Sequence, residues 1–174
     1  MTIKTIYLIG FMGSGKSTVG YQLAKQLGKS YIDTDQLIEK KYEQKIANIF
    51  KIHGEDVFRM YEMECLGQAS AYQIVSTGGG IVERQKNLQT MNDHGIIVYL
   101  QTSFDVIAQR IDKDQTRPLW NKDSRETRDL FNNRTDMYEA FADYTIQTDD
   151  KSVDAIVKEV IQILAIGEID SFNT

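Results

Sequence analysis

Short apolar runs alternate along this chain with longer stretches in which apolar residues recur at helical spacing. The runs occupy residues 3–9, 30–33, 73–77, 96–100 and 144–148, and each has the length and composition of a strand. One intervening helix is expected to end at Gly28, and the last helix has an apolar stripe over residues 153–164. Parallel strands need crossover connections that are usually helical. The alternation therefore predicts an α/β fold, with a parallel sheet covered by helices on both faces.

The composition is that of one folded domain. The chain has 174 residues, 41% of them hydrophobic, and a formal net charge of -5. Cys65 is the only cysteine, which excludes an intramolecular disulfide framework. The apolar runs are too short for a signal peptide or a membrane-spanning helix, so we expect a cytoplasmic protein. A sequence pI of about 5.1 argues against broad nucleic-acid binding.

The most specific motif is the segment GFMGSGKS at residues 10–17, which follows the first predicted strand and precedes a predicted helix. It fits the pattern of a phosphate-binding P-loop, in which glycines let backbone N–H groups surround a phosphate at a helix N-terminus. Lys16 would supply positive charge to the β and γ phosphates, and Ser17 would offer a hydroxyl to Mg²⁺. The motif predicts a nucleotide ligand but does not define the reaction.

Polar or glycine-rich residues also follow the second and third predicted strands, where ligands bind in open α/β sheets. Asp33 and Asp35 could serve a metal ion and a substrate hydroxyl. Alternatively, Asp35 could cap a helix that begins near Gln36. The consecutive glycines at 78–80 fit either a close approach to a ligand or an ordinary turn.

Two arginines have both a structural and a functional interpretation. Arg59 could pair with Glu55 or Glu62 on its own helix. Arg134 could stack on Tyr138, one helical turn further on. Either side chain could instead bind an anionic ligand.

A polar segment at about 112–124 shows no periodicity and contains the only proline, Pro118, directly after Arg117. It is longer than most connections, so it is expected to be either a lid over the ligand site or simply a mobile loop.

In order along the chain, these motifs resemble those of the shikimate kinase family. The matching residues are the P-loop, Asp33-Thr34-Asp35, Gly54-Glu55 with Phe58-Arg59 and Glu62, Thr77 with the three glycines, Arg117-Pro118-Leu119, and Arg134 with Tyr138. The resemblance covers the chain from about residue 3 to 164.

This resemblance implies a three-layer P-loop fold of the nucleoside-monophosphate-kinase type, with a five-stranded parallel sheet in the order 2-3-1-4-5 and a mobile lid. It implies one kinase domain over residues 1–167, with a substrate-binding helical segment at about 34–64 and the lid at about 112–124. Residues 168–174 would form a flexible tail.

The same resemblance implies an ATP-dependent kinase that uses Mg²⁺ and phosphorylates the 3-hydroxyl of shikimate, in aromatic amino-acid biosynthesis. The implied catalytic residues are Lys16, Asp35 and Arg117, where Asp35 orients or deprotonates the hydroxyl and Arg117 moves onto the transferring phosphate. The ATP-binding residues would be Gly13, Ser14, Gly15, Lys16, Ser17, Thr18, Arg110, Arg117 and Lys151. Shikimate would contact Asp35, Arg59, Gly79, Gly80 and Arg134. Ser17 would bind Mg²⁺ directly and Asp33 through water.

Two other functions are compatible with the P-loop. One is another small-molecule kinase on the same scaffold, such as a gluconate kinase. The other is a switch protein that binds ATP without phosphorylating a metabolite. The two arginines and the triple glycine favour shikimate over gluconate as the substrate. Asp35, Arg59 and Arg134 argue against a switch protein, because a switch has no use for a carboxylate clamp. We expect ATP and shikimate as the only partners of a monomer that binds neither nucleic acid nor membrane.

Overall fold

A computed structural model describes the backbone of residues 4–111 and 124–170, and the side chains of residues 4–111 and 124–165. The predicted strands are present as β1 (Thr5–Ile9), β2 (Tyr31–Asp33), β3 (Ile74–Ser76), β4 (Gly95–Gln101) and β5 (Tyr144–Gln147). They form one parallel sheet in the order β2-β3-β1-β4-β5. This order confirms the predicted topology.

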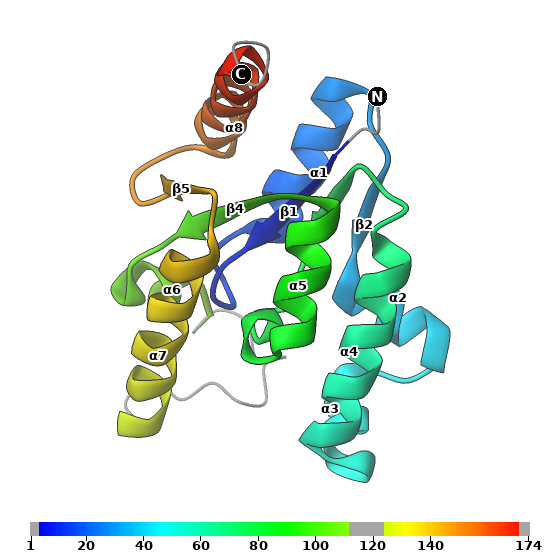
Figure 1. Cartoon of the computed structure of the whole chain (residues 1–174). Coiled ribbons are helices and arrows are strands. Elements are labelled where there is room, and N and C mark those ends of the chain that lie inside the picture. Colours follow the sequence, from blue (N-terminus) through cyan, green and yellow to red (C-terminus); the bar gives the residue numbers. More distant parts are fainter. Residues whose placement is uncertain (1–3, 112–123, 171–174) are drawn as a thin grey trace.

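Helices connect the strands and lie on both sides of the sheet (Figure 1). In chain order they are α1 (Lys16–Leu27), α2 (Thr34–Tyr42), α3 (Ile46–His53), α4 (Glu55–Ala69), the 3-10 helix η1 (Ile81–Glu83), α5 (Gln85–His94), α6 (Phe104–Ile111), α7 (Arg125–Phe141) and α8 (Val153–Asp170). Gly28 ends α1 in the left-handed conformation, with φ 61°, as predicted. None of the described helices is both long and apolar enough to cross a membrane.

Two of the sequence predictions concern segments that the structure describes only in part. The backbone of α8 continues to Asp170, so the first residues of the predicted tail, 168–170, are helical. Most of the predicted lid, including Arg117 and Pro118, lies outside the described residues.

The sheet separates two hydrophobic cores because successive strand residues point to opposite faces. Leu8 of β1 packs with α1 and α8, whereas its neighbours Tyr7 and Ile9 pack on the other face. The α8 stripe is buried in the first core through Ile156, Val157 and Val160. The second core includes Leu66 and Ala69 of α4, Leu88 and Met91 of α5, Ile107 of α6 and Tyr138 of α7. The molecule therefore has the expected three layers.

A third, smaller core joins α2, α3 and α4 beside the sheet. It consists of Ile38, Ile49, Phe58 and Cys65, with partly buried neighbours that include Tyr61. Cys65 is fully buried, as expected for a small core residue. This core fixes α4 relative to α2, and so determines where the polar residues of these helices lie.

Three strands end at the same level of the sheet. In the parallel register, Ser76 of β3 pairs with Leu8 of β1 on one side and with Asp33 of β2 on the other. Thr77 reinforces this edge, because its backbone N–H and its hydroxyl both donate to the Leu8 carbonyl. The P-loop, the aspartates and the triple glycine therefore begin side by side.

Candidate active site

The P-loop requires glycine at several positions. Gly13 and Gly15 have φ of 78° and 94°, in the left-handed region that residues with a Cβ rarely adopt. Gly15 is the N-cap of α1 and makes no side-chain capping hydrogen bond. The first N–H groups of α1 therefore face the loop, where the positive end of the helix dipole favours an anion.

Lys16 lies inside this loop. Its ammonium donates hydrogen bonds to the carbonyls of Gly10, at 2.7 Å, and of Phe11, at 2.9 Å. The residue is only 8% exposed. These contacts hold the charged group at the position where an anionic ligand of the loop would meet it.

A cavity of about 480 Å³ opens from the loop toward the ends of β2 and β3. It brings together many of the predicted ligand residues. Its lining includes Gly13, Ser14, Gly15, Lys16, Ser17, Thr18, Asp33, Asp35, Thr77, Gly79, Arg110 and Lys151. Arg110 donates to the Gly13 carbonyl at 3.1 Å, and Lys151 forms an ion pair with Glu159 at 2.6 Å.

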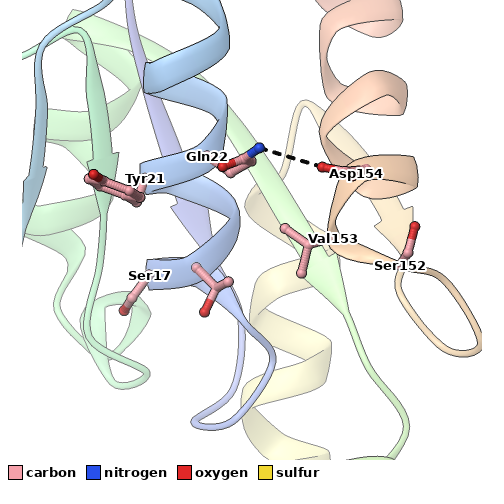
Figure 2. Close-up of a pocket in the computed structure, with 7 residues that line it drawn as sticks. Ser17, Tyr21, Gln22, Ser152, Val153 and Asp154 are labelled. Atoms are coloured by element: carbon pink, nitrogen blue, oxygen red, sulfur yellow. Dashed lines mark hydrogen bonds between the residues drawn. The ribbon is translucent and has the colours of Figure 1, made fainter.

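A second, open groove of about 600 Å³ adjoins this cavity between α1 and the start of α8. Figure 2 shows Gln22 of α1 facing Asp154 near the start of α8, where its side-chain amide donates a hydrogen bond of 3.5 Å to Oδ1 of Asp154. The cavity and the groove share Ser17, Thr18 and Val153, so the groove extends the loop cavity along α1.

Asp33 connects the second strand with the P-loop. Its Oδ2 accepts a hydrogen bond of 2.5 Å from the Ser17 hydroxyl, and its Oδ1 accepts from the backbone N–H groups of Asp35 and Gln36. Asp33 is therefore the N-cap of α2, which begins at Thr34. The alternative that Asp35 caps a helix from Gln36 is wrong, because Asp33 has the extended backbone of a cap and Asp35 already lies in the first turn.

Asp35 and Glu62 both approach the first glycine of the triplet closely. A Cβ built on Gly78 would lie 2.9 Å from Oδ1 of Asp35 and 2.8 Å from Oε1 of Glu62. Since real Cβ atoms essentially never come within 3.0 Å of another heavy atom, a side chain at Gly78 would force both carboxylates to shift.

Arg59 and Arg134, which we call the arginine pair, converge on the carboxylate of Glu83. Arg134 donates through Nε at 2.8 Å and Nη2 at 2.7 Å to Oε1 of Glu83, while Nη2 of Arg59 lies 2.9 Å from Oε2. Each arginine side chain is only 5% exposed. Both ion pairs expected for Arg59 within its helix are present as well, with Glu55 at 3.0 Å and Glu62 at 2.9 Å.

Glu62 is a fully buried acid. Burial raises the pKa of its carboxyl, because the charged form loses hydration, and the positive charge of Arg59 opposes this effect only in part. Two buried atoms here, Oε1 of Glu62 and Nε of Arg59, have no hydrogen-bond partner within the described part of the chain. Both groups therefore have hydrogen-bonding capacity that the described residues do not use.

The second and third glycines of the triplet touch this arginine pair. A side chain at Gly80 would overlap the guanidinium of Arg59, and one at Gly79 would lie 3.7 Å from Nη1 of Arg134. The Gly79 carbonyl accepts a short hydrogen bond from the hydroxyl of Tyr138, whose pKa is raised by burial. The stacking partner of Arg134 is Phe11, at 5.7 Å, rather than Tyr138.

The structure thus brings the predicted ATP-side and substrate-side residues to one edge of the sheet, with the exception of Arg117, which lies outside the described residues. Glu83 was missed by sequence reasoning. Its position three residues after the triple glycine, in the connection that follows β3, was the available signal.

The model of the family described as "Shikimate kinase" matches residues 12–165, which is most of the chain. The chain belongs to the shikimate kinase family. A shikimate kinase from Bacillus mycoides is 43% identical over 164 residues, covering 92% of this chain and 98% of the relative. The solved structure described as shikimate kinase from Acinetobacter baumannii in complex with shikimate has 35% identity and a TM-score of 0.89, with 95% of each chain covered.

Membership of the shikimate kinase family makes this chain an ATP-dependent phosphotransferase. A gluconokinase from Sinorhizobium meliloti also superposes, with a TM-score of 0.66, 19% identity and 99% of this chain and 98% of that chain covered. At that identity the likeness concerns the fold alone. The comparisons therefore favour shikimate kinase over the gluconate kinase alternative.

Proposed function

We propose that this protein transfers the γ-phosphoryl group of ATP to the 3-hydroxyl of shikimate, giving shikimate 3-phosphate and ADP. The observation that carries the proposal is the arginine pair, two buried guanidiniums beside a P-loop cavity. A planar guanidinium matches a carboxylate through two parallel hydrogen bonds, and shikimate has one carboxylate on a ring with three hydroxyls. The A. baumannii relative, whose structure contains shikimate, supports this choice of substrate.

ATP would bind along the P-loop, with its phosphates near the N–H groups of Gly13, Ser14, Gly15, Ser17 and Thr18. Phosphate oxygens would replace the carbonyls that now accept from the Lys16 ammonium. Arg110 and Lys151 line the same cavity, which supports a role for them on the adenine side. Arg117 is proposed to reach the transferring phosphate from the lid at about 112–124.

The oxygen atoms at Ser17 and Asp33 fit a magnesium ion. Mg²⁺ prefers hard oxygen ligands and keeps several waters, and the Ser17 hydroxyl and Asp33 carboxylate lie 2.5 Å apart at the edge of the cavity. No group of three or more His, Cys, Asp or Glu suited to a metal occurs among the described residues, so phosphates and water would complete the shell. Ser17 would bind the ion directly and Asp33 through water. When bound, Mg²⁺ would neutralise charge on the phosphates.

The substrate would lie between the arginine pair and the P-loop. Arg59 and Arg134 would hold its carboxylate, the backbone of Gly79 and Gly80 would contact the ring, and Asp35 would accept a hydrogen bond from the reacting hydroxyl. That oxygen attacks the γ-phosphorus, the bond to the β–γ bridging oxygen breaks, and ADP leaves. Asp35 either orients the hydroxyl or takes its proton.

We further propose one kinase domain over residues 1–167, in which the segment 34–64 forms part of the substrate site. Its partners would be ATP and shikimate alone, without nucleic acid or membrane. A cytoplasmic monomer is the form we expect, consistent with a free, buried Cys65. Size-exclusion chromatography with light scattering measures the oligomeric state.

A coupled assay of ADP release with shikimate and with gluconate tests the function. Turnover with shikimate and not with gluconate is expected. The reverse result would identify a gluconate kinase, and ATP binding without turnover on either substrate would favour a switch protein.

Two arginine variants test the clamp. Arg134→Ala should raise the KM for shikimate and leave the KM for ATP unchanged, because Arg134 belongs to the arginine pair and does not line the P-loop cavity. Arg125→Ala is the matched control. It also removes an arginine from α7, but the Arg125 side chain is 94% exposed. Equal loss of both affinities in Arg134→Ala would mean that the arginine is structural.

A further inference from the structure

The arginine pair is bridged by a carboxylate of the chain itself. Oε1 of Glu83 accepts both hydrogen bonds from Arg134, and Oε2 faces Arg59 at 2.9 Å. One carboxylate thus engages two guanidiniums, with one oxygen on each. A substrate carboxylate held by the same two residues would need the same N–H donors.

Charge explains why this bridge forms. Two guanidiniums that are each 5% exposed would repel one another if no anion lay between them. Glu62 pairs with Arg59. Among the described residues, the ion pairs of Arg134 are with Glu83 alone. Glu83 is therefore the group that neutralises the second guanidinium.

We propose that Glu83 occupies the anion position of the arginine pair until substrate binds, and that the carboxylate of the substrate displaces it. The proposal rests on the proposed function, in which Arg59 and Arg134 bind the shikimate carboxylate. If Glu83 stayed in place, the substrate would add a further carboxylate to two guanidiniums that already pair with Glu55, Glu62 and Glu83, and would leave uncompensated negative charge.

Glu83 is the carboxylate best able to leave. Its side chain is 28% exposed, whereas that of Glu62 is fully buried. It lies at the end of the short helix η1, before the extended residue Arg84. A rotation of this one side chain into water would free the donors of Arg134 while both guanidiniums keep their position.

An internal competitor also makes the site selective. A ligand gains the arginine pair only if it supplies an anion that replaces Glu83, so an uncharged analogue is rejected more strongly than by an open clamp. If Glu83 occupies the pair for about nine-tenths of the time, the apparent Kd for shikimate is about tenfold higher than that of the open pair.

Calorimetric titration of Glu83→Gln tests this displacement. The amide keeps the size of the side chain but removes its charge, so the Kd for shikimate should fall by about three- to tenfold. The Kd for the methyl ester of shikimate, which carries no carboxylate charge, should not fall. The Kd for ATP should remain unchanged, because Glu83 does not line the P-loop cavity. Glu55→Gln is the control, since it removes a 56% exposed partner of Arg59, and its Kd for shikimate should stay within about twofold.

Unchanged or weaker shikimate binding by a folded Glu83→Gln protein would overturn the proposal and make Glu83 a positioning residue for the arginines. Equal gains for shikimate and its methyl ester would overturn it too. If Glu83→Gln does not fold, Glu83→Asp replaces it, because the shorter side chain cannot bridge both guanidiniums and should also lower the Kd. Failure of the native chain to bind shikimate would refute the proposed function itself, and this outcome is read from the native protein alone.

Discussion

Gly80 provides the sharpest test of how closely the arginine pair is packed. Its φ of -91° is open to any residue, so alanine introduces no backbone strain there. The added methyl, however, would lie 2.5 Å from Cζ of Arg59 and closer still to both terminal nitrogens. Ordinary contact begins near 3.4 Å, so the guanidinium must retreat by about 1 Å.

That displacement would break a set of buried contacts. Arg59 would lose its hydrogen bond of 2.9 Å to Glu62 and its 2.9 Å contact with Glu83. Overpacking costs about 1–3 kcal/mol, and separating a buried ion pair costs about 3–5 kcal/mol. Because Arg59 can keep its partner Glu55 at the exposed end, we expect a net loss of about 2–4 kcal/mol in the free energy of unfolding, together with weaker shikimate binding.

Urea unfolding followed by circular dichroism measures the first effect and calorimetric titration with shikimate the second. Gly67→Ala is the matched control, because this exposed glycine lies within α4 and a Cβ there would have no heavy atom within 4 Å. It should stabilise the protein by about 0.5–1 kcal/mol, as alanine does in a helix, and leave shikimate binding unchanged. If Gly80→Ala were as stable as the native protein, the guanidinium of Arg59 would not be fixed where the structure has it.

Other positions yield shorter tests. Gly20→Ala should lower the free energy of unfolding by about 1–3 kcal/mol in urea titrations, because its methyl would overlap the Ser76 hydroxyl between α1 and β3; an unchanged midpoint would contradict this packing. Tyr138→Phe should cost about 1 kcal/mol through loss of the hydrogen bond to Gly79 and raise the KM for shikimate in the coupled assay, whereas a change in the KM for ATP alone would speak against that role. Burial raises the pKa of Glu62, so its contribution to stability is present below the ordinary pKa and lost as the pH rises through the raised one. The free energy of unfolding of the native chain minus that of Glu62→Gln should thus fall as the pH rises above the ordinary carboxyl pKa, and a rise would mean that the charge of Arg59 dominates.

The sheet and the P-loop could be predicted from the sequence because their signals are local. Apolar runs and helical spacing reflect burial along single elements, and the loop glycines reflect backbone conformations that only glycine adopts readily. The strand order 2-3-1-4-5 came from the family resemblance, since periodicity within an element contains no information about which strands are neighbours.

The partners of the arginines could not be predicted, because they depend on contacts between distant elements. Local spacing gave Arg59 two glutamates on its own helix, and both pair with it, but Glu83 reaches it from η1, which follows β3 in the sequence. Arg134 lies on α7, and the residues separating it from η1 in the sequence include all of β4. One of the two interpretations of Asp35 made it the N-cap of α2, although Asp33 holds that position. Asp33 and Asp35 are equally good capping residues, and only the backbone angles distinguish them.

Gly79 lies between the P-loop and the arginine pair and contacts both of them. A Cβ there would lie 3.2 Å from the backbone nitrogen of Met12 and 3.7 Å from Nη1 of Arg134. A Cβ at this position would make the P-loop backbone at Met12 give way by a few tenths of an ångström, while its contact with Arg134 would be an ordinary one. Phosphoryl transfer depends on holding donor and acceptor in line at close range, so even a small shift of the loop matters. The hydrogen bond from Tyr138 to the Gly79 carbonyl fixes this contact from α7, the helix that also carries Arg134. The P-loop and the arginine pair therefore meet at a residue without a side chain, which is anchored by the same helix that carries Arg134.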